Sequence, residues 1–198
     1  MKKGRLVRFH SLVCTILGAS VALPAGALAP PAVAAPPPLS ATQKNIETAG
    51  TAIAIAVPLF AGGLSLYRRD WTGVAQLTAD TVLTVGTAYA LKNFVRERRP
   101  DGSDYHSFPS GTTALSASGS SYLWDRYGWS WGLPAFAASQ FVSYSRIQAK
   151  QHHWYDTLAS SALGIGYGYL VTSRYRGHFS SDLSASPEGG YLRLSYAW

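Results

Sequence analysis

SRIQAKQHHWYD, residues 145–156, is the stretch that decides the fold class of this chain. His152 and Asp156 lie four residues apart, so a helix would bring both side chains to one face. A carboxylate on one imidazole nitrogen fixes the tautomer and leaves the other nitrogen free to attack. Arg146 could hold phosphate oxygens in bidentate geometry. Taken alone, such a His–Asp pair could equally be structural or bind a metal.

A basic cluster, KNFVRERRP at 92–100, lies upstream of this stretch. Lys92 and Arg99 are seven residues apart, about two helical turns, so a continuous helix would place them on one face. Pro100 would end that helix. Two cations at a helix end can clamp an anion, although a solvated basic helix end is the simpler alternative.

A third cluster, FPSGTTA at 108–114, lies between the other two and immediately before an apolar segment. Ser110 or Thr112 could cap the helix that begins there. Backbone N–H groups at the start of a helix bind phosphate readily. The alternative is a capped helix with no further role.

In this order, the three clusters resemble the signature of the type-2 phosphatidic acid phosphatase and haloperoxidase superfamily. That signature is K-x6-R-P, then P-S-G-H, then S-R-x5-H-x3-D. The first motif is complete as Lys92, Arg99 and Pro100, and the third as Ser145, Arg146, His152 and Asp156. The region from the first motif to the last covers about a third of the chain.

The resemblance implies a role for each matched residue. His152 would attack phosphorus, and Asp156 would orient its ring. The phosphate would be bound by Lys92, Arg99, Ser110, Gly111, Thr112 and Arg146. Phosphatases of this family use no metal, so neither a metal nor another cofactor is expected, and the family's core is an all-α bundle.

The second motif departs from the family because Thr112 stands where the family has histidine, the general acid that protonates the leaving oxygen. An alcohol is too weak an acid for this role, and general acid catalysis is typically worth about 10²–10⁴-fold. His106 could act instead from the same loop. His153 is a weaker candidate because it would point about 100° away from His152 on a helix. Alternatively, a diphosphate substrate with a better leaving group would need no acid, or catalysis is weakened or lost.

Apolar segments at 48–67, 73–94, 112–124, 131–144 and 157–172 predict an all-α helical bundle. The first is long enough to span a bilayer. Abundant Gly, Ala and Ser suit close helix contacts in a membrane, and hydrophobic residues make up 47% of the chain against 14% charged. We therefore expect a membrane-embedded phosphatase domain at 45–176, with a tightly packed soluble bundle as the alternative.

The amino terminus has the pattern of a secretory signal peptide over residues 1–34, with a basic start, an apolar stretch and an A-x-A site at 32–34. An uncleaved membrane helix is the alternative. Cleavage after Ala34 would lower the net charge from +7 to +3, so the basic balance gives little support to nucleic-acid binding. The only cysteine, Cys14, lies in the predicted signal, which excludes disulfides and thiolate chemistry from the mature chain.

A Pro/Ala-rich linker is predicted at 35–44, and a carboxy-terminal tail at 177–198. Two alternating runs, 179–183 and 191–198, flank turn residues and predict a short β-hairpin. The last run also resembles the final strand of an outer-membrane barrel, but the chain offers no segments for the other strands.

The function expected from the resemblance is hydrolysis of phosphorylated lipids, including diphosphates, through a phosphohistidine at the periplasmic face of the bacterial inner membrane. The alternatives are a lipid phosphotransferase, a soluble periplasmic acid phosphatase, and a phosphate- or lipid-binding pseudoenzyme without the acid. Haloperoxidase activity is disfavoured because that chemistry also relies on the histidine replaced by Thr112.

Overall fold

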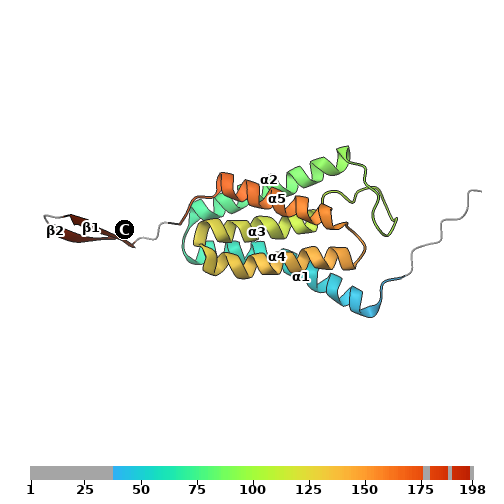
Figure 1. Cartoon of the computed structure of the whole chain (residues 1–198), viewed down its shortest axis with the longest axis horizontal. Coiled ribbons are helices and arrows are strands. Elements are labelled where there is room, and N and C mark those ends of the chain that lie inside the picture. Colours follow the sequence, from blue (N-terminus) through green and yellow to red (C-terminus); the bar gives the residue numbers. More distant parts are fainter. Residues whose placement is uncertain (1–37, 176–178, 187–188, 197–198) are drawn as a thin grey trace, which may run out of the picture. The chain divides into compact units, whose positions relative to one another are not determined.

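The computed structural model describes residues 38–175, 179–186 and 189–196; the predicted signal peptide at 1–34 lies outside them. The described residues form a helical bundle and a two-stranded antiparallel sheet, which confirms the predicted all-α bundle with its carboxy-terminal hairpin (Figure 1). The elements are α1 (Ala41–Tyr67), α2 (Trp71–Phe94), α3 (Gly111–Tyr127), α4 (Trp129–Gln148), α5 (Trp154–Val171), β1 (Phe179–Ser186) and β2 (Gly189–Tyr196).

Helix α1 begins at Ala41, inside the segment 35–44 for which composition predicts a linker. The reason is a capping box: the Ser40 hydroxyl accepts from the Gln43 N–H, and the Gln43 side chain accepts from the Ser40 N–H. A single residue, Gly128, connects α3 and α4. Its φ of +92° suits glycine and turns the chain within one residue.

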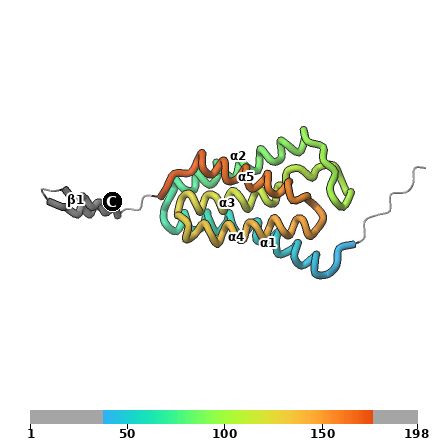
Figure 2. The backbone as a smooth tube through the Cα atoms, in the orientation of Figure 1, coloured from blue at the N-terminus to red at the C-terminus, as the bar shows by residue number. Residues whose placement is uncertain are grey.

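Helix α3 is the centre of the bundle, and it contacts each of the other helices (Figures 1 and 2). Its sequence has no apolar stripe; most of its buried side chains are Ser, Ala or Gly. Small side chains on a central helix let its neighbours approach closely, as in helix packing within membranes. Packing around α3 thus depends on small residues rather than on a large apolar core.

Gly164 on α5 marks one of these close approaches. A Cβ added there would lie 2.6 Å from the Ala117 Cβ and 2.8 Å from the Ala117 carbonyl carbon on α3. Gly166, on the same helix, has open space around the corresponding position. The two glycines therefore offer a matched test of how tightly α5 packs on α3.

We expect Gly164→Ala to destabilise the bundle by about 1–3 kcal/mol, because backbone atoms of α3 cannot move aside without separating the helices. Gly166→Ala is expected to be neutral or to stabilise by up to about 1 kcal/mol, since alanine favours a helix over glycine. Thermal unfolding of both variants in the same detergent checks this. Equal melting temperatures would contradict the packing described here.

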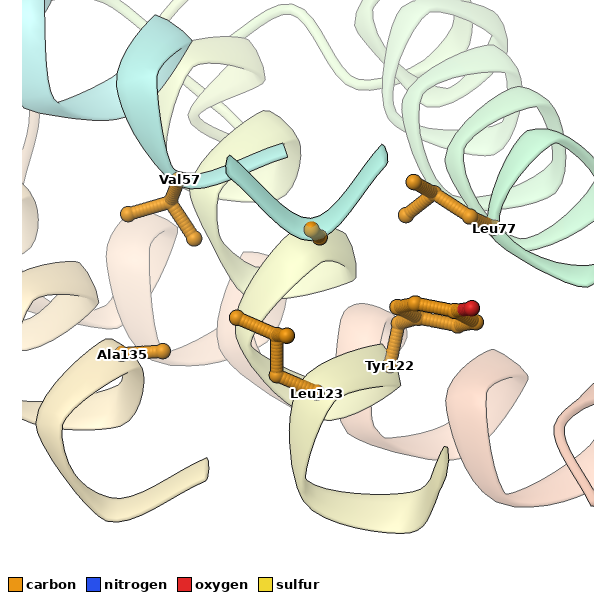
Figure 3. Close-up of a cluster of buried hydrophobic side chains, with 6 residues drawn as sticks. Val57, Leu77, Tyr122, Leu123 and Ala135 are labelled. Atoms are coloured by element: carbon orange, nitrogen blue, oxygen red, sulfur yellow. The ribbon is translucent and has the colours of Figure 1, made fainter. Parts of the chain in front are cut away.

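The apolar core is a single small cluster where α1, α2, α3 and α4 meet. Its buried members are Val57, Ala61, Leu77, Tyr122, Leu123 and Ala135, and Figure 3 shows them converging from these helices. The Tyr122 hydroxyl, 2.7 Å from the Ser65 Oγ, has a partner within the core. Most other buried positions hold serine, threonine, alanine or glycine.

Large apolar side chains lie mainly on the outer surface of the bundle. Aliphatic ones are exposed along the helices, among them Ile55, Leu59, Val82, Leu133, Leu158 and Ile165. Among the described residues, only α1 is both long and apolar enough by composition to cross a membrane. The other helices have a lower mean hydropathy because their inward faces carry small polar residues, while their outward faces remain apolar.

Candidate active site

The first basic cluster does not lie on one helix, so the prediction that Lys92 and Arg99 share a helical face was wrong. Helix α2 ends at Phe94, and Val95 is already extended. The chain then forms a loop in which the Ser107 N–H donates to the Glu97 carbonyl. This loop folds back toward α2 and brings Arg99 to the same cavity as Lys92.

Each of the two cations is held by this loop. The Lys92 Nζ donates to the carbonyl of His106 at 2.8 Å. The Arg99 Nε donates to the Asp104 carboxylate at 2.8 Å, and the His106 backbone N–H donates to the same oxygen. The bond to Asp104 uses only the Nε of Arg99, so its terminal amino groups can still donate to an incoming phosphate.

The second cluster forms the start of α3, as its sequence predicts. Ser110 is the N-cap, and its buried hydroxyl accepts from the Thr113 N–H at 3.4 Å. Gly111 and Thr112 follow in the first turn and line the cavity. The N–H groups of a first helical turn have no partners within the helix, which makes this position suitable for an anion.

The third cluster also departs from the sequence expectation. His152 precedes α5, which begins at Trp154 with His153 as its N-cap, so His152 and Asp156 do not share a helical face. Asp156 instead reaches back from the first turn: its Oδ2 accepts from the His153 N–H at 2.8 Å and lies 3.5 Å from the His152 Nδ1. Capping of the helix by Asp156 thus brings the pair together.

A backbone carbonyl sets the tautomer of His152. Its Nδ1 lies 2.7 Å from the carbonyl oxygen of Ser107. Because a carbonyl can only accept, this nitrogen carries the proton, and the lone pair is on Nε2. Burial lowers the pKa of His152, and the charges of Lys92 and Arg99 lower it further, which keeps the ring neutral near pH 7.

Asp156 is fully buried behind His152. Burial opposes its ionisation, but the adjacent His152 ring and hydrogen bonds from the Ser107 hydroxyl at 2.5 Å and the His153 N–H outweigh this, so its pKa lies below the usual value. A carboxylate in this position favours a positive charge on the imidazole as it reacts. Ser107 therefore touches both members of the pair, and no sequence motif pointed to it.

A cavity of about 460 Å³ lies in front of His152. Its lining includes most of the predicted residues, together with others that the sequence did not suggest: Tyr89, Lys92, Asn93, Arg99, Asp104, His106, Gly111, Thr112, Gln151 and His152. Tyr89 lies three residues before Lys92 and four before Asn93 on α2, a helical spacing that could have identified Tyr89. Ser110 and Asp156 lie behind the lining.

Arg146 is not among the residues that line the cavity. Its guanidinium donates to the Glu47 carbonyl at 2.6 Å and to the Thr51 hydroxyl at 2.9 Å, both on α1. It also donates to the Gln151 side chain at 3.2 Å. The resemblance implies that Arg146 binds phosphate directly. To do so, Arg146 would have to break these hydrogen bonds and form new ones to the phosphate.

His106 and His153 are the two candidates for the general acid, and their positions differ. His106 lines the cavity, with its Nδ1 3.9 Å from the Asp104 carboxylate. His153 is not in the lining: its ring stacks on Tyr155, and its Nδ1 lies 3.5 Å from the Asp156 Oδ2. The geometry favours His106.

The fold and the cavity define a helical-bundle protein that holds a buried neutral histidine, two cations and a helix N-terminus around an anion-sized space. The model of the PAP2 superfamily matches residues 71–179, a range that contains all three motifs. The chain belongs to this superfamily.

A lipid A 4'-phosphatase of Helicobacter pylori (strain J99 / ATCC 700824) is 31% identical over 160 residues, which cover 72% of this chain and 80% of that protein. The crystal structure of Aquifex aeolicus LpxE has the same fold, with a TM-score of 0.55 at 21% identity. The match covers 66% of this chain and 82% of the LpxE chain.

Proposed function

We propose that this protein is a phosphatase that removes phosphate from a membrane lipid through a covalent phosphohistidine at His152. The observation that carries the proposal is the hydrogen bond from the His152 Nδ1 to the Ser107 carbonyl, which leaves the Nε2 lone pair free in a cavity lined by Lys92 and Arg99.

In the first step the His152 Nε2 attacks phosphorus, and a P–N bond forms as the bond to the lipid oxygen breaks. His106 gives its proton to that oxygen. Water then attacks phosphorus, the electron pair of the P–N bond returns to Nε2, and His106 takes the proton from water. Lys92, Arg99 and the N–H groups of α3 stabilise the charge on the phosphoryl oxygens in both steps.

The substrate we favour is a phosphate monoester on a lipid of the lipid A type. The lipid A 4'-phosphatase relative supports this choice, and His106 in the cavity supplies the acid that a monoester requires. A lipid diphosphate is the second candidate, because Thr112 removes the family's usual acid and a phosphate is a better leaving group than an alkoxide.

The surface of the bundle supports an embedded protein. Large apolar side chains face outward along the helices, and α1 has the length and composition of a membrane span. Exposed aromatic residues gather at both ends, as in membrane-interface belts: Tyr67, Trp71, Trp129 and Tyr169 at one end, and Phe94, Tyr105, Tyr144 and Trp154 at the other.

We further propose that the cavity faces the periplasm from the bacterial inner membrane. This orientation rests on the secretory pattern of residues 1–34, with 45–176 as the phosphatase domain and 177–198 as a tail. Extraction without detergent would separate this arrangement from a soluble periplasmic phosphatase, which would be released in soluble form.

The proposal is tested by phosphate release from lipid A, phosphatidate and a polyprenyl diphosphate, using the protein purified in detergent without residues 1–34. We expect release from lipid A that disappears in His152→Ala. Recovery of the phosphate on a second lipid would indicate a phosphotransferase. A folded protein that binds these lipids but transfers no phosphate would be a pseudoenzyme.

The pH dependence of substrate affinity tests the role of Lys92. Burial lowers the pKa of Lys92 to about 8, and the charge of Arg99 adds to the effect. The ammonium is present below this pH and lost above it, so we expect KM for a lipid phosphate to rise as the pH increases through about 8. Lys92→Arg should remove this rise, because a guanidinium stays charged. A rise that persists in Lys92→Arg would exclude Lys92 as its cause.

A further inference from the structure

A second hollow in the bundle lies between α4 and α5, with α3 as its floor, and its volume is about 600 Å³. Its lining shares no residue with the cavity around His152. From Gly111 at that cavity to Asp125 at the hollow, α3 runs about 20 Å. The lining consists of Ser120, Ser121, Trp124, Asp125, Leu133, Phe136, Ile165, Gly166 and Tyr169.

We propose that this groove is a binding site for an aminophospholipid. An acyl chain lies between α4 and α5, the headgroup ammonium pairs with Asp125, and the headgroup phosphate pairs with Arg174. The proposal rests on the membrane embedding proposed above but not on the phosphohistidine chemistry.

The shape and lining of the groove suit an acyl chain. Its walls are apolar, with Leu133 and Phe136 on α4 facing Ile165 and Tyr169 on α5. Gly166 has no side chain to narrow the groove, and nothing lies within 4 Å of the position that its Cβ would take. A linear hydrocarbon fits such a groove, whereas a compact polar ligand would find few partners there.

The charges at one end of the groove specify the headgroup. Among residues 38–175, the Asp125 carboxylate forms no hydrogen bond and no ion pair within 4 Å, and Arg174 is the cation whose charge acts on it. A carboxylate in an apolar setting is costly unless a positive group neutralises it. The neighbouring Trp124 ring adds a surface that attracts a cation.

Arg174 supplies the complementary charge. It is exposed, and its Nη1 donates to the Trp124 carbonyl at 3.3 Å, one residue from Asp125. A carboxylate and a guanidinium side by side match a headgroup that carries both an ammonium and a phosphate. An anionic headgroup such as phosphatidylglycerol would satisfy Arg174 and leave Asp125 without a cation.

The test is retention of lipid by the purified full-length protein, measured by native mass spectrometry after incubation with dioleoyl phosphatidylethanolamine or dioleoyl phosphatidylglycerol. We expect the ethanolamine lipid to be retained at least about tenfold better. Asp125→Asn should abolish this preference. Equal retention of the two lipids by the unmodified protein would overturn the proposed headgroup recognition.

Two glycines provide matched variants for the acyl chain. Gly166→Leu would fill the groove, while Gly86→Leu on α2 would place the same side chain in open space elsewhere. We expect retention to be lost in Gly166→Leu and unchanged in Gly86→Leu. Equal retention in both would show that lipid binds outside the groove.

Phosphate release measured on the same samples separates this inference from the proposed function. The groove variants should keep full phosphatase activity because they lie far from His152. If the protein releases no phosphate but still shows the lipid preference, the groove proposal stands and the enzymatic proposal fails. If the lipid preference is absent but phosphate release is intact, the groove proposal fails and the enzymatic proposal stands.

Discussion

Replacement of His152 by alanine is expected to lower phosphate release by at least about 10⁴-fold, because no other group can form the covalent intermediate. The structure predicts so large an effect because the His152 Nε2 faces the cavity, while its Nδ1 is held by Ser107. Initial rates of phosphate release from lipid A by the two purified proteins measure it.

His153→Ala is the matched control, since it removes the adjacent histidine. The His153 ring lies outside the cavity lining, and the bond that orients Asp156 comes from the His153 backbone, which the substitution keeps. We expect a loss of less than about tenfold, comparable to a disturbed packing contact. Similar losses in both variants, with similar melting temperatures, would mean that His152 has no special role.

The second large effect concerns the leaving group. We expect His106→Ala to lower turnover of a lipid phosphomonoester by about 10²–10⁴-fold and to leave turnover of p-nitrophenyl phosphate or a lipid diphosphate nearly unchanged. Only an alkoxide needs a proton as it leaves. The hydrogen bonds of this residue with Lys92 and Asp104 use its backbone and would survive the substitution.

A second substitution tests whether an acid at another position in the cavity can replace His106. Thr112→His in the His106→Ala background should restore monoester turnover, because Thr112 lines the same cavity at the position where the resemblance places the family's acid. A uniform loss on all substrates in His106→Ala would show that His106 is not the acid. If His106→Ala were harmless and Thr112→His alone raised monoester turnover, the natural substrate would be a diphosphate.

Four of the five helices could be predicted from sequence because their segments are clearly apolar and rich in small residues. Helix α3 shows the limit of this approach. Its serines and alanines make it less apolar than the other predicted helices, yet it is the most central one. Its central position depends on close packing against glycines of neighbouring helices, such as Gly164 on α5. A hydropathy profile does not detect such packing.

The residues of the site could be identified from the spacing of the motifs, but their geometry could not. Helical spacing suggested that Lys92 and Arg99 share a face, whereas Val95 ends the helix and a loop carries Arg99 back. Ser107 was missed because its bond to His152 uses a backbone carbonyl, which any residue supplies, and its hydroxyl bond to Asp156 joins residues 49 apart in sequence.

Arg146 illustrates a second limit. Its motif implies a phosphate contact, but its actual partners, Glu47 and Thr51, are about a hundred residues away in sequence. Gly50 allows α1 to approach this closely, since a Cβ there would overlap the Ser145 side chain. Such a long-range contact leaves no local pattern that a single sequence could reveal.

The central claim is a covalent phosphoryl group on His152, and trapping that intermediate tests it most directly. The protein would be mixed with lipid substrate labelled with ³²P, quenched in alkali within milliseconds to seconds, digested and sequenced by mass spectrometry. We predict a label on the peptide that contains His152, stable in alkali and lost in acid, and absent from His152→Ala. Rapid phosphate release with no labelled protein, or with the label on another residue, would contradict this mechanism.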